Sequence, residues 1–433
     1  MDNPPPPTIR LRSRLWPALA ILLFILQVLW PDKTWTALLG ILGGGWLLAW
    51  LWVRSLARHL SIEREMRYGW TQVGDRLEER FTISNTGWAP AVWLEVRDHS
   101  NLPHYTASRV TGVGAEDITQ WRSEGVCTRR GLYSLGPTSL LCGDPLGLYS
   151  LEMHLPDSAI LLVLPPVLPL PAIEIASGGR AGEGSRYRRS ALERTVSAQT
   201  VREYVEGDPL KAIHWPTSAR RASLYVRQFE QMPSSDWWIF LDLQAAVQVG
   251  EGDLSTEEHG VVLAASLADR GLRQGHAVGL VTCGRQLTWI PPRRSPTQLM
   301  DILRALALAS RGDRPLEDLL AQARKSIRSG ASLVLITPSL QPGWLAPLLQ
   351  LSRLGITPTV LLLDPASFGG EGNASGLAAL FQEHGLSHTI VSADLLDQPE
   401  QRGREGEWEW RVVGPGKAVP VRRPLQVEWR RVQ

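Results

Sequence analysis

Cysteine is scarce in this sequence. The three cysteines, Cys127, Cys142 and Cys283, include no C-x-x-C pair. An odd, sparse set with this spacing argues against a disulfide framework and against a zinc site. Cys127 and Cys142 could still pair in an oxidising compartment, but the membrane topology argued below places them in a reducing one. We therefore expect buried, unreactive thiols.

An excess of charge of one sign is also missing. The chain has 45 basic and 43 acidic side chains, for a formal net charge of +2. Nucleic-acid binding would need a strongly basic domain or stripe, so no nucleic-acid partner is expected. At 433 residues, the chain is too long for one ordinary hydrophobic core, which predicts two or three domains.

Phenylalanine is rare, with 6 residues, whereas tryptophan is abundant, with 18. Many of the tryptophans lie near two uncharged apolar runs, at residues 15–30 and 35–53. A bilayer core of about 30 Å needs roughly 20 apolar helical residues, which fits the second run. The first run is short and would need Arg14 to reach toward the interface. We predict a two-helix transmembrane hairpin within residues 1–60, with membrane lipid as its partner.

The small residues Gly40 and Gly44 are spaced for close helix packing. A small-xxx-small pair lets two helices approach, either within the hairpin or between copies of the chain in a homo-oligomer. Two alternatives to the hairpin are less consistent with the sequence. A cleaved signal peptide should be followed by an A-x-A-like site, and few soluble helices are apolar on all faces.

Basic residues around the two runs predict the orientation. The loop between the runs has only Lys33, beside Asp32, whereas both flanks are rich in arginine. These flanking arginines are Arg10, Arg12, Arg14, Arg54, Arg58, Arg64 and Arg67. The positive-inside rule then predicts a two-pass protein of the cell membrane, with its N-terminus and soluble domains in the cytoplasm.

The remaining chain divides by its hydrophobic pattern. Residues 61–171 alternate in short strands broken by Asn-Thr-Gly, Gly-Pro and Asp-Pro turns, which predicts a small β-sandwich. Residues 172–235 hold a basic glycine-rich loop, which lacks the Lys-Ser/Thr of a phosphate loop, and then a strand–helix–strand unit. Residues 236–395 and 396–433 predict an α/β domain and a C-terminal extension with extra strands.

The α/β prediction depends on a change of hydrophobic period. The stretch "DWWIFLDL" is a continuous apolar run of the length that a buried strand needs. A helix follows at 256–274, with Ser255 or Thr256 as its cap. Strand and helix patterns then alternate, and "SFGGEGNASG" is expected to be a loop insertion. This alternation predicts a doubly wound parallel sheet covered by helices on both faces.

The strand–helix–strand unit concentrates polar side chains at residues 202–221, and the alternating "SLYVRQFE" that follows predicts its second strand. Its local pattern predicts a strand ending at Gly207, then Asp208 as the N-cap of a short helix. We expect that helix to end at Trp215, where Pro216 interrupts it.

An active site is one alternative at this unit, with His214 as base, Asp208 as its orienting group and Ser218 as nucleophile. Anion binding at the helix N-terminus, near Lys211 and two arginines, is another. Asp208 argues against both alternatives. As an N-cap it already accepts hydrogen bonds from backbone amides, so it is less free to orient His214, and its negative charge would repel an anion. A structural or docking surface remains the preferred interpretation.

The motif order carries a family resemblance. The residues concerned are Arg202, Tyr204, Gly207, Asp208, Ile213, His214, Trp215, Ser218, Ala219 and Arg220, together with "RGLYSLGP" and "DPLGLYS" at 130–150. The pattern resembles domain-of-unknown-function family fifty-eight. The resemblance implies a membrane-anchored cytoplasmic protein with a von Willebrand factor A-like domain, working beside a MoxR-type AAA+ ATPase. It implies no reaction.

Domains of the A type often bind Mg²⁺ through an Asp-x-Ser-x-Ser motif. Here the motif is degenerate, with Asp242, Gln244 and Ala246 at its three positions, so we expect no metal and no cofactor. The carboxyl edge of the sheet, with Asp242, Thr282 and Asp364, remains a candidate ligand edge.

The sequence as a whole predicts a non-enzymatic, membrane-anchored interaction scaffold or assembly adaptor. Its docking residues would include Lys211, Arg220 and Arg221. The alternative is hydrolase-like or anion-binding activity around Asp208 and His214.

Overall fold

The computed structural model describes most of the chain. The described residues are 6–171, 173–176, 194–204, 213–221, 223–231, 236–397, 408–413, 417–422 and 430–431. They cluster into two compact units. Unit 1 consists of Met1–Pro166, Leu306–Leu308 and Arg402–Gln433, and unit 2 consists of Val167–Ala305 and Ala309–Gln401.

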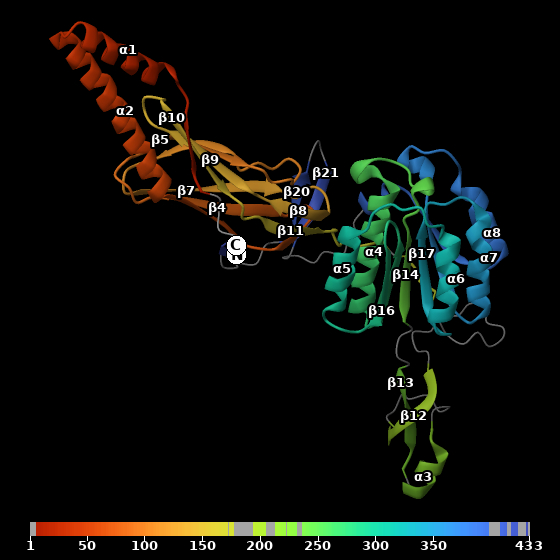
Figure 1. The fold of residues 1–433 in the computed structure, drawn as a ribbon. Helices are drawn as coiled ribbons and strands as arrows, with labels where there is room; N and C mark the ends of the chain where they lie inside the picture. Colours follow the sequence, from red (N-terminus) through yellow and green to blue (C-terminus); the bar gives the residue numbers. More distant parts are fainter. Residues whose placement is uncertain are drawn as a thin grey trace. The chain divides into compact units, whose positions relative to one another are not determined.

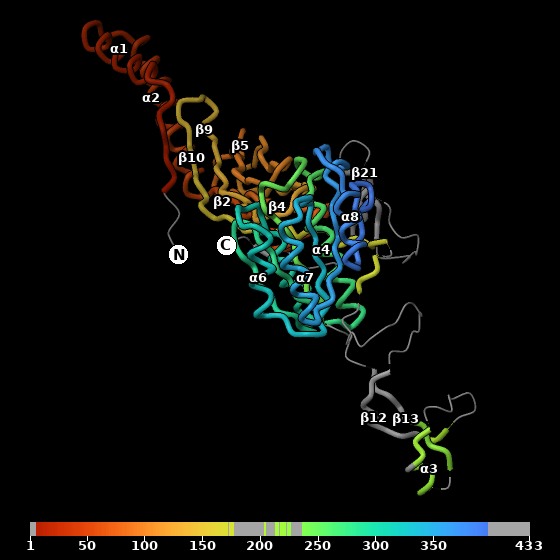
Figure 2. Tube along the Cα trace, turned by 90° about the vertical axis from the view of Figure 1, so that its right-hand side faces the viewer, coloured from red at the N-terminus to blue at the C-terminus, as the bar shows by residue number. Residues whose placement is uncertain are grey.

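Unit 1 begins with two consecutive apolar helices, α1 (Leu15–Leu29) and α2 (Lys33–His59), which lie side by side in both views (Figures 1 and 2). The Asp32 side chain caps α2 by accepting a hydrogen bond from the Thr34 amide at 2.7 Å. By length and composition, α2 is long and apolar enough to cross a membrane, while α1 belongs to the shorter apolar helices.

Helix α2 extends past residue 53, the end of its apolar run, and continues to His59 among the sheets of unit 1. Val53 and Leu56 are fully buried in the core of unit 1 because the last turns of α2 pack against the sheets. The prediction that the two helices of this chain pack closely at Gly40 and Gly44 is wrong. A Cβ added at either glycine would meet no atom within 4 Å.

The sheets of unit 1 form a β-sandwich-like body. One sheet has the order β1-β10-β9-β5-β6 and another the order β22-β2-β4-β7, with a small third sheet, β3-β11-β8. The strands are β1 (Thr8–Leu11), β2 (Leu60–Met66), β3 (Trp70–Gln72), β4 (Arg76–Asn85), β5 (Ala91–Asp98), β6 (Arg109–Val113), β7 (Asp117–Val126), β8 (Gly131–Leu135), β9 (Thr138–Gly143), β10 (Tyr149–Leu155), β11 (Ala159–Leu164) and β22 (Arg430–Arg431). One core joins the two larger sheets, through residues such as Phe81, Leu94 and Leu151.

Two strands of the unit 1 sheets lie outside segment 61–171, in which the sandwich was expected. Strand β1 pairs antiparallel with β10, and β22 pairs with β2. In the C-terminal extension, β20 (Trp408–Val413) and β21 (Lys417–Arg422) form a separate hairpin. The extra strands expected there are therefore present.

The main body of unit 2 is a six-stranded sheet with helices on both faces (Figure 1). Its strand order is β16-β15-β14-β17-β18-β19, and all neighbours are parallel except β15 and β16. The strands are β14 (Trp237–Asp242), β15 (Val278–Cys283), β16 (Leu287–Arg293), β17 (Ser332–Thr337), β18 (Thr357–Leu363) and β19 (Ser387–Val391). The sequence predicted a purely parallel sheet. That prediction is wrong at one edge, because β16 is antiparallel to β15.

Side chains alternate between the two faces of this sheet. Trp238 and Phe240 face a core to which three of the helices contribute, whereas Leu241 faces α4, where a Cβ on Gly260 would come within 2.9 Å of it. The helices are α4 (Thr256–Arg273), α5 (Gln298–Leu308), α6 (Leu316–Ser326), α7 (Leu345–Arg353) and α8 (Ala374–Glu383), with short 3-10 turns at η2 (Ala245–Val247), η3 (Gly252–Leu254), η4 (Pro342–Trp344), η5 (Pro365–Phe368) and η6 (Leu395–Asp397).

Helix α4 has the predicted cap, since Ser255 accepts a hydrogen bond from the Glu258 amide. The expected loop insertion is partly wrong, because Asn373 caps α8 and the helix begins at Ala374.

Unit 2 also contains an antiparallel pair, β12 (Arg194–Glu203) and β13 (Tyr225–Gln231), with α3 (Trp215–Arg221) between them in sequence.

Candidate functional site

The strand–helix–strand unit is held by backbone hydrogen bonds to β13. The His214 amide donates to the Tyr225 carbonyl at 2.7 Å, and Ile213 is buried opposite Val226. Helix α3 begins at Trp215 and includes Pro216, so the expectation that Pro216 ends a helix is wrong. Proline fits here because the first helical turn needs no amide donor.

Several expected site residues cannot be placed. Gly207, Asp208 and Lys211 lie outside the described residues, as does the side chain of Arg202. Tyr204 is placed, and its amide donates to the Leu224 carbonyl at 2.8 Å.

The geometry does not assemble a nucleophile and a base. The Ser218 hydroxyl is 3.1 Å from the His214 carbonyl and accepts from the Tyr225 amide at 2.8 Å. The His214 ring instead meets the Thr217 hydroxyl, with Nδ1 and Oγ1 2.7 Å apart. Ser218 is also buried, so its described contacts serve the backbone of this unit.

Several other side chains of α3 are exposed. The Trp215 side chain is 66% exposed, and Ala219, Arg220 and Arg221 are exposed as well. The guanidinium of Arg221 lies 5.4 Å from the centre of the Tyr225 ring, and a hydrogen bond to Tyr225 raises the pKa of Arg221. Helix α3 thus combines a buried, backbone-bonded serine with an exposed indole and two exposed cations.

The carboxyl edge of the six-stranded sheet holds a buried acidic group. Asp242, at the end of β14, accepts from the Thr337 hydroxyl at 2.7 Å and from the Gln244 amide at 3.0 Å. Thr337 ends β17, and its hydroxyl accepts in turn from the Ser339 amide at 3.0 Å. Burial raises the pKa of Asp242, and the bonds from Thr337 and Gln244 only partly oppose that rise.

The other residues expected at this edge do not join Asp242. Thr282 is buried in β15, where it lies opposite Leu241. Asp364 follows β18, and its Oδ1 atom is buried without a hydrogen-bond partner among the described residues.

The degenerate metal motif continues into a short 3-10 turn that contains Ala246. In the part of the chain that the structure describes, no group of three or more His, Cys, Asp or Glu side chains is placed to hold a metal ion.

Sequence reasoning missed a buried ionic network in unit 1. Arg64 on β2 makes two hydrogen bonds of 2.7 Å to the Glu79 carboxylate on β4 and one of 2.9 Å to Asp98 at the end of β5. Tyr105 also donates to Glu79, and Ser100 accepts from Arg64 at 3.1 Å. The network links the two larger sheets, because β2 and β4 belong to one and β5 to the other.

One guanidinium in this network is paired with two carboxylates, those of Glu79 and Asp98. Burial lowers the pKa of Arg64, but the hydrogen bond to Glu79 and the charges of Glu79 and Asp98 outweigh it and raise the pKa overall. For Tyr105, burial and the neighbouring Glu79 charge both raise the pKa of the phenol. The network therefore holds Arg64 as a cation and Tyr105 as a neutral donor at physiological pH.

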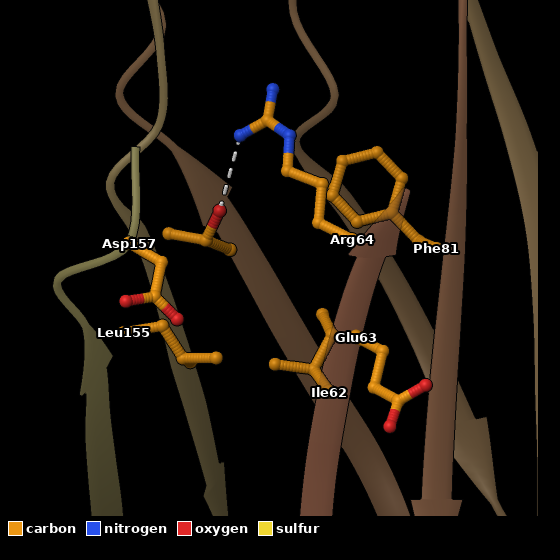
Figure 3. Close-up of a pocket in the computed structure, with 7 residues that line it drawn as sticks. Ile62, Glu63, Arg64, Phe81, Leu155 and Asp157 are labelled. Atoms are coloured by element: carbon orange, nitrogen blue, oxygen red, sulfur yellow. Dashed lines mark hydrogen bonds between the residues drawn. The ribbon is translucent and has the colours of Figure 1, made fainter. Parts of the chain in front are cut away.

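A cavity of about 200 Å³ lies beside this network (Figure 3). In the close-up, Arg64 and Phe81 lie opposite Leu155 and Asp157. Arg64 also approaches the Thr138 hydroxyl, at 3.4 Å, on the wall of the cavity. Since Arg64 already has carboxylate partners, the cavity offers little unsatisfied charge to a ligand.

The alternation of the strands carried a signal for this network. Arg64 falls on the inward face of β2 between Ile62 and Met66, and Glu79 falls on the inward face of β4 beside Phe81. Opposite charges at inward positions of neighbouring strands must pair, because an isolated buried charge is strongly unfavourable.

Comparison with known proteins gives a family and distant relatives. The sequence model of the family described as "Protein of unknown function DUF58" matches residues 200–367, which is less than half of the chain. The matched segment includes the described part of the strand–helix–strand unit and the sheet as far as β18. This agrees with the resemblance inferred from the sequence motifs of that segment.

The relatives are matched over parts of their length. "Uncharacterized protein YeaD" of Bacillus subtilis is 30% identical over 112 residues, which are 26% of this chain and 26% of that protein. "Uncharacterized protein Rv1480" of Mycobacterium tuberculosis is 25% identical over 170 residues, which are 38% of this chain and 54% of that protein. The match thus spans about a quarter and about half of these two relatives.

Solved structures align only weakly. The CARDB domain of a Pyrococcus furiosus protein aligns at a TM-score of 0.18 and 14% identity, over 24% of this chain and 91% of that domain. Proximal thread matrix protein 1 of the mussel byssus aligns at a TM-score of 0.28 and 14% identity, over 38% of this chain and 43% of that protein. Scores this low establish no shared fold.

Proposed function

We propose that this chain is a membrane-anchored interaction scaffold or assembly adaptor without catalysis of its own. Its two N-terminal helices would cross the cell membrane, its soluble units would lie in the cytoplasm, and its α/β body would be of the von Willebrand factor A type. Its partner would be a MoxR-type AAA+ ATPase, as the family resemblance implies.

The observation that carries the interaction role is the exposed face of α3. An indole that is 66% exposed and two exposed arginines, Arg220 and Arg221, on one short helix are residue types that protein interfaces favour. The rest of the unit is fixed by the bonds of Ser218 and His214, so this face is presented in a defined orientation.

Two further features support the proposal. The apolar side chains of α1 and α2 are mostly exposed, which favours an environment of lipid. The strand order of the α/β body runs third, second, first, fourth, fifth and sixth in its own sequence, with one antiparallel edge strand. That arrangement suits a doubly wound domain whose ligands bind at the carboxyl edge.

The test is purification of the full-length protein from its own cells in mild detergent after cross-linking, with partners identified by mass spectrometry. We expect a MoxR-type ATPase to be recovered with the wild type and lost with Trp215→Ala or Arg221→Glu. Trp70→Ala is the matched control, because Trp70 is another partly exposed indole, 46% exposed, in unit 1.

If both α3 variants still bound the ATPase, its binding surface would not be α3. Failure to recover any such ATPase with the wild type would overturn the partnership.

A further inference from the structure

The turn between β9 and β10 lies directly beside the apolar helix α2. A Cβ built on Gly45 of α2 would be 3.8 Å from Cδ1 of Leu146. The tip of this turn, Pro145-Leu146-Gly147, is exposed, and Leu146 is 54% exposed although it is a large apolar side chain. An apolar tip is thus attached to the side of a helix that is itself apolar.

The position of Leu146 along α2 gives its depth. Residues 34–53 of α2, at about 1.5 Å per residue, span about 30 Å, which is the thickness of a bilayer core. Gly45 precedes Val53 by eight residues, or about 12 Å along the helix axis. If α2 spans the core in this register, Leu146 lies on the hydrocarbon side of the boundary that the exposed Arg54 marks.

Asp144 satisfies three backbone amides of the turn. The Asp144 carboxylate accepts from the Leu148 amide at 3.2 Å and from the Tyr149 amide at 2.6 Å, and the Asp144 carbonyl accepts from the Gly147 amide at 3.1 Å. Asp144 itself is 1% exposed, and Pro145 has no amide to satisfy. These bonds lower the number of backbone amides that the tip would bring unpaired into surroundings that are poor in water.

A second loop, which contains Trp88, contacts α2 nearer to its C-terminal end. The Trp88 ring packs edge-on against Trp52 with centroids 5.5 Å apart, and Trp88 is 53% exposed. The Trp52 indole donates to the Pro90 carbonyl at 3.0 Å, which fixes this loop to the helix. Trp88 therefore lies one to two turns nearer the soluble end of α2 than Leu146, at the interfacial depth that indole rings prefer.

Charged groups lie farther along α2. A Cβ on Gly87 would meet Ser55 and His59, and the Glu116 amide donates to the Gly87 carbonyl. On the two loops that contact α2, the order is therefore apolar tip, then indole, then polar groups, as the polarity of a bilayer changes from its core to water. The exposed Arg12, whose amide donates to the Leu148 carbonyl at 2.8 Å, lies at the base of the turn on β1's side.

We propose that the Pro145-Leu146-Gly147 tip inserts into the acyl-chain side of the lipid headgroup boundary, beside α2. The ligand is the bilayer lipid itself. Unit 1 would then be fixed to the membrane surface at α2, at the tip and at Trp88, instead of being tethered through α2 alone. This inference rests on the membrane anchoring of the proposed function, but not on any protein partner.

The experiment uses full-length protein with a single introduced thiol, labelled with the environment-sensitive dye NBD and reconstituted in phosphatidylcholine–phosphatidylglycerol vesicles. Leu146→Cys reports the tip and Trp88→Cys the second loop. Ser158→Cys is the matched control, because it is exposed near the far end of β10, about 20 Å from the turn along the strand. The native thiols are buried, and burial raises the pKa of Cys127 and Cys142 to about 12, so they resist labelling.

We expect the dye at position 146 to show a blue-shifted emission and to be quenched by lipids that carry a doxyl group on the acyl chain. The dye at 88 should show a smaller shift, and the dye at 158 should show the emission of a dye in water and be quenched by iodide. A vesicle-bound protein whose dye at 146 behaves like the dye at 158 would overturn the inference and leave the anchor intact. A dye at 146 that is shielded from iodide but not quenched by doxyl lipid would assign the tip to a protein contact, which also overturns it. Failure of the wild type to float with the vesicles would overturn the anchor as well.

Discussion

Unit 1 buries two carboxylates around one arginine, whereas the α/β body of unit 2 buries a single carboxyl against a hydroxyl. In unit 1, the side chains of Glu79 and Asp98 are 0% and 1% exposed, and each lies within 2.9 Å of the Arg64 guanidinium. In unit 2, Asp242 is 2% exposed, and its two carboxylate hydrogen bonds come from a neutral hydroxyl and a backbone amide.

The Arg64 network is a structural connection between two sheets, whereas Asp242 is a buried carboxyl without a cationic hydrogen-bond partner. In the Arg64 network both carboxylates are paired with the same guanidinium, and the network joins two sheets. The Asp242 carboxyl is desolvated without a cation among its hydrogen-bond partners, so its ionised form is disfavoured in the folded state. A carboxyl of this kind at the carboxyl edge of a sheet gives the α/β body a stability that depends on pH.

The largest expected effect is on the sandwich network. Arg64→Met would leave the buried charges of Glu79 and Asp98 without their cation, and breaking a buried pair in this way costs about 3–5 kcal/mol. Urea unfolding of the full-length protein in detergent, with hydrogen exchange of the β4 and β5 peptides as the local readout, measures the loss.

The matched control is Arg97→Met, because Arg97 pairs with Glu95 on an exposed part of β5. We expect no measurable change in the stability of unit 1 from this substitution, since exposed ion pairs contribute little. Equal losses from Arg64→Met and Arg97→Met would contradict the distinction between a buried network and a surface pair.

The sequence predicted the secondary structure better than its pairing. The apolar runs, the Ser255 cap and the continuous strand at Trp237–Asp242 depend on local chemistry, and the structure has all three. The antiparallel edge strand β16 was missed because "LTWIPPR" contains two prolines, which mark strand interiors as unlikely but are tolerated at an edge. Strand β1 was missed, and the pairing of the expected C-terminal strand β22 with β2 was not predicted, because their partners are distant in the sequence.

The candidate site was harder to predict than the fold. The sequence placed Asp242 at the sheet edge, but the bond from Thr337 depends on strand neighbours that are 95 residues apart. Ser218 and His214 look like catalytic residues in the sequence, yet a turn of helix directs the Ser218 hydroxyl to the backbone. Residue type alone does not distinguish these two uses of a serine.

An intermediate effect is expected at Thr337. Thr337→Val keeps the shape of the side chain but removes the hydroxyl that donates to Asp242 and accepts from Ser339. Leaving buried polar groups unsatisfied costs about 1–3 kcal/mol. The loss should be larger at pH 7 than at pH 4, because the ionised Asp242 depends most on the donated bond.

Hydrogen exchange of the β14 and β17 peptides measures this loss within the α/β body. Thr337→Ser keeps the hydroxyl and should restore most of the protection. If Thr337→Ser were as damaging as Thr337→Val, packing of the methyl group would be responsible, and the hydrogen bond would not.

The smallest effect is expected from Asp242→Asn, and its sign depends on pH. Because the folded-state pKa of Asp242 is raised above its unfolded value, the folded protein binds this proton more tightly than the unfolded chain does. The wild type therefore has its full stability below the unfolded pKa, near pH 4, and loses part of it as the pH rises through the folded pKa. Asparagine does not titrate, so the stability of the variant relative to the wild type should improve as the pH rises from 4 to 7.

The slope of this difference with pH is the test, since the constant part also contains the rearranged bond to Thr337. Other titrating groups cancel in the difference as long as they are unchanged by the substitution. Asp301→Asn, on the partly exposed surface of α5, is the control and should give a flat difference over the same range. A flat difference for Asp242→Asn would mean that the pKa of the buried carboxyl is not raised in the folded state. Asp242 and the Arg64 network would then differ in where they lie in the fold, but not in how burial affects the ionisation of Asp242.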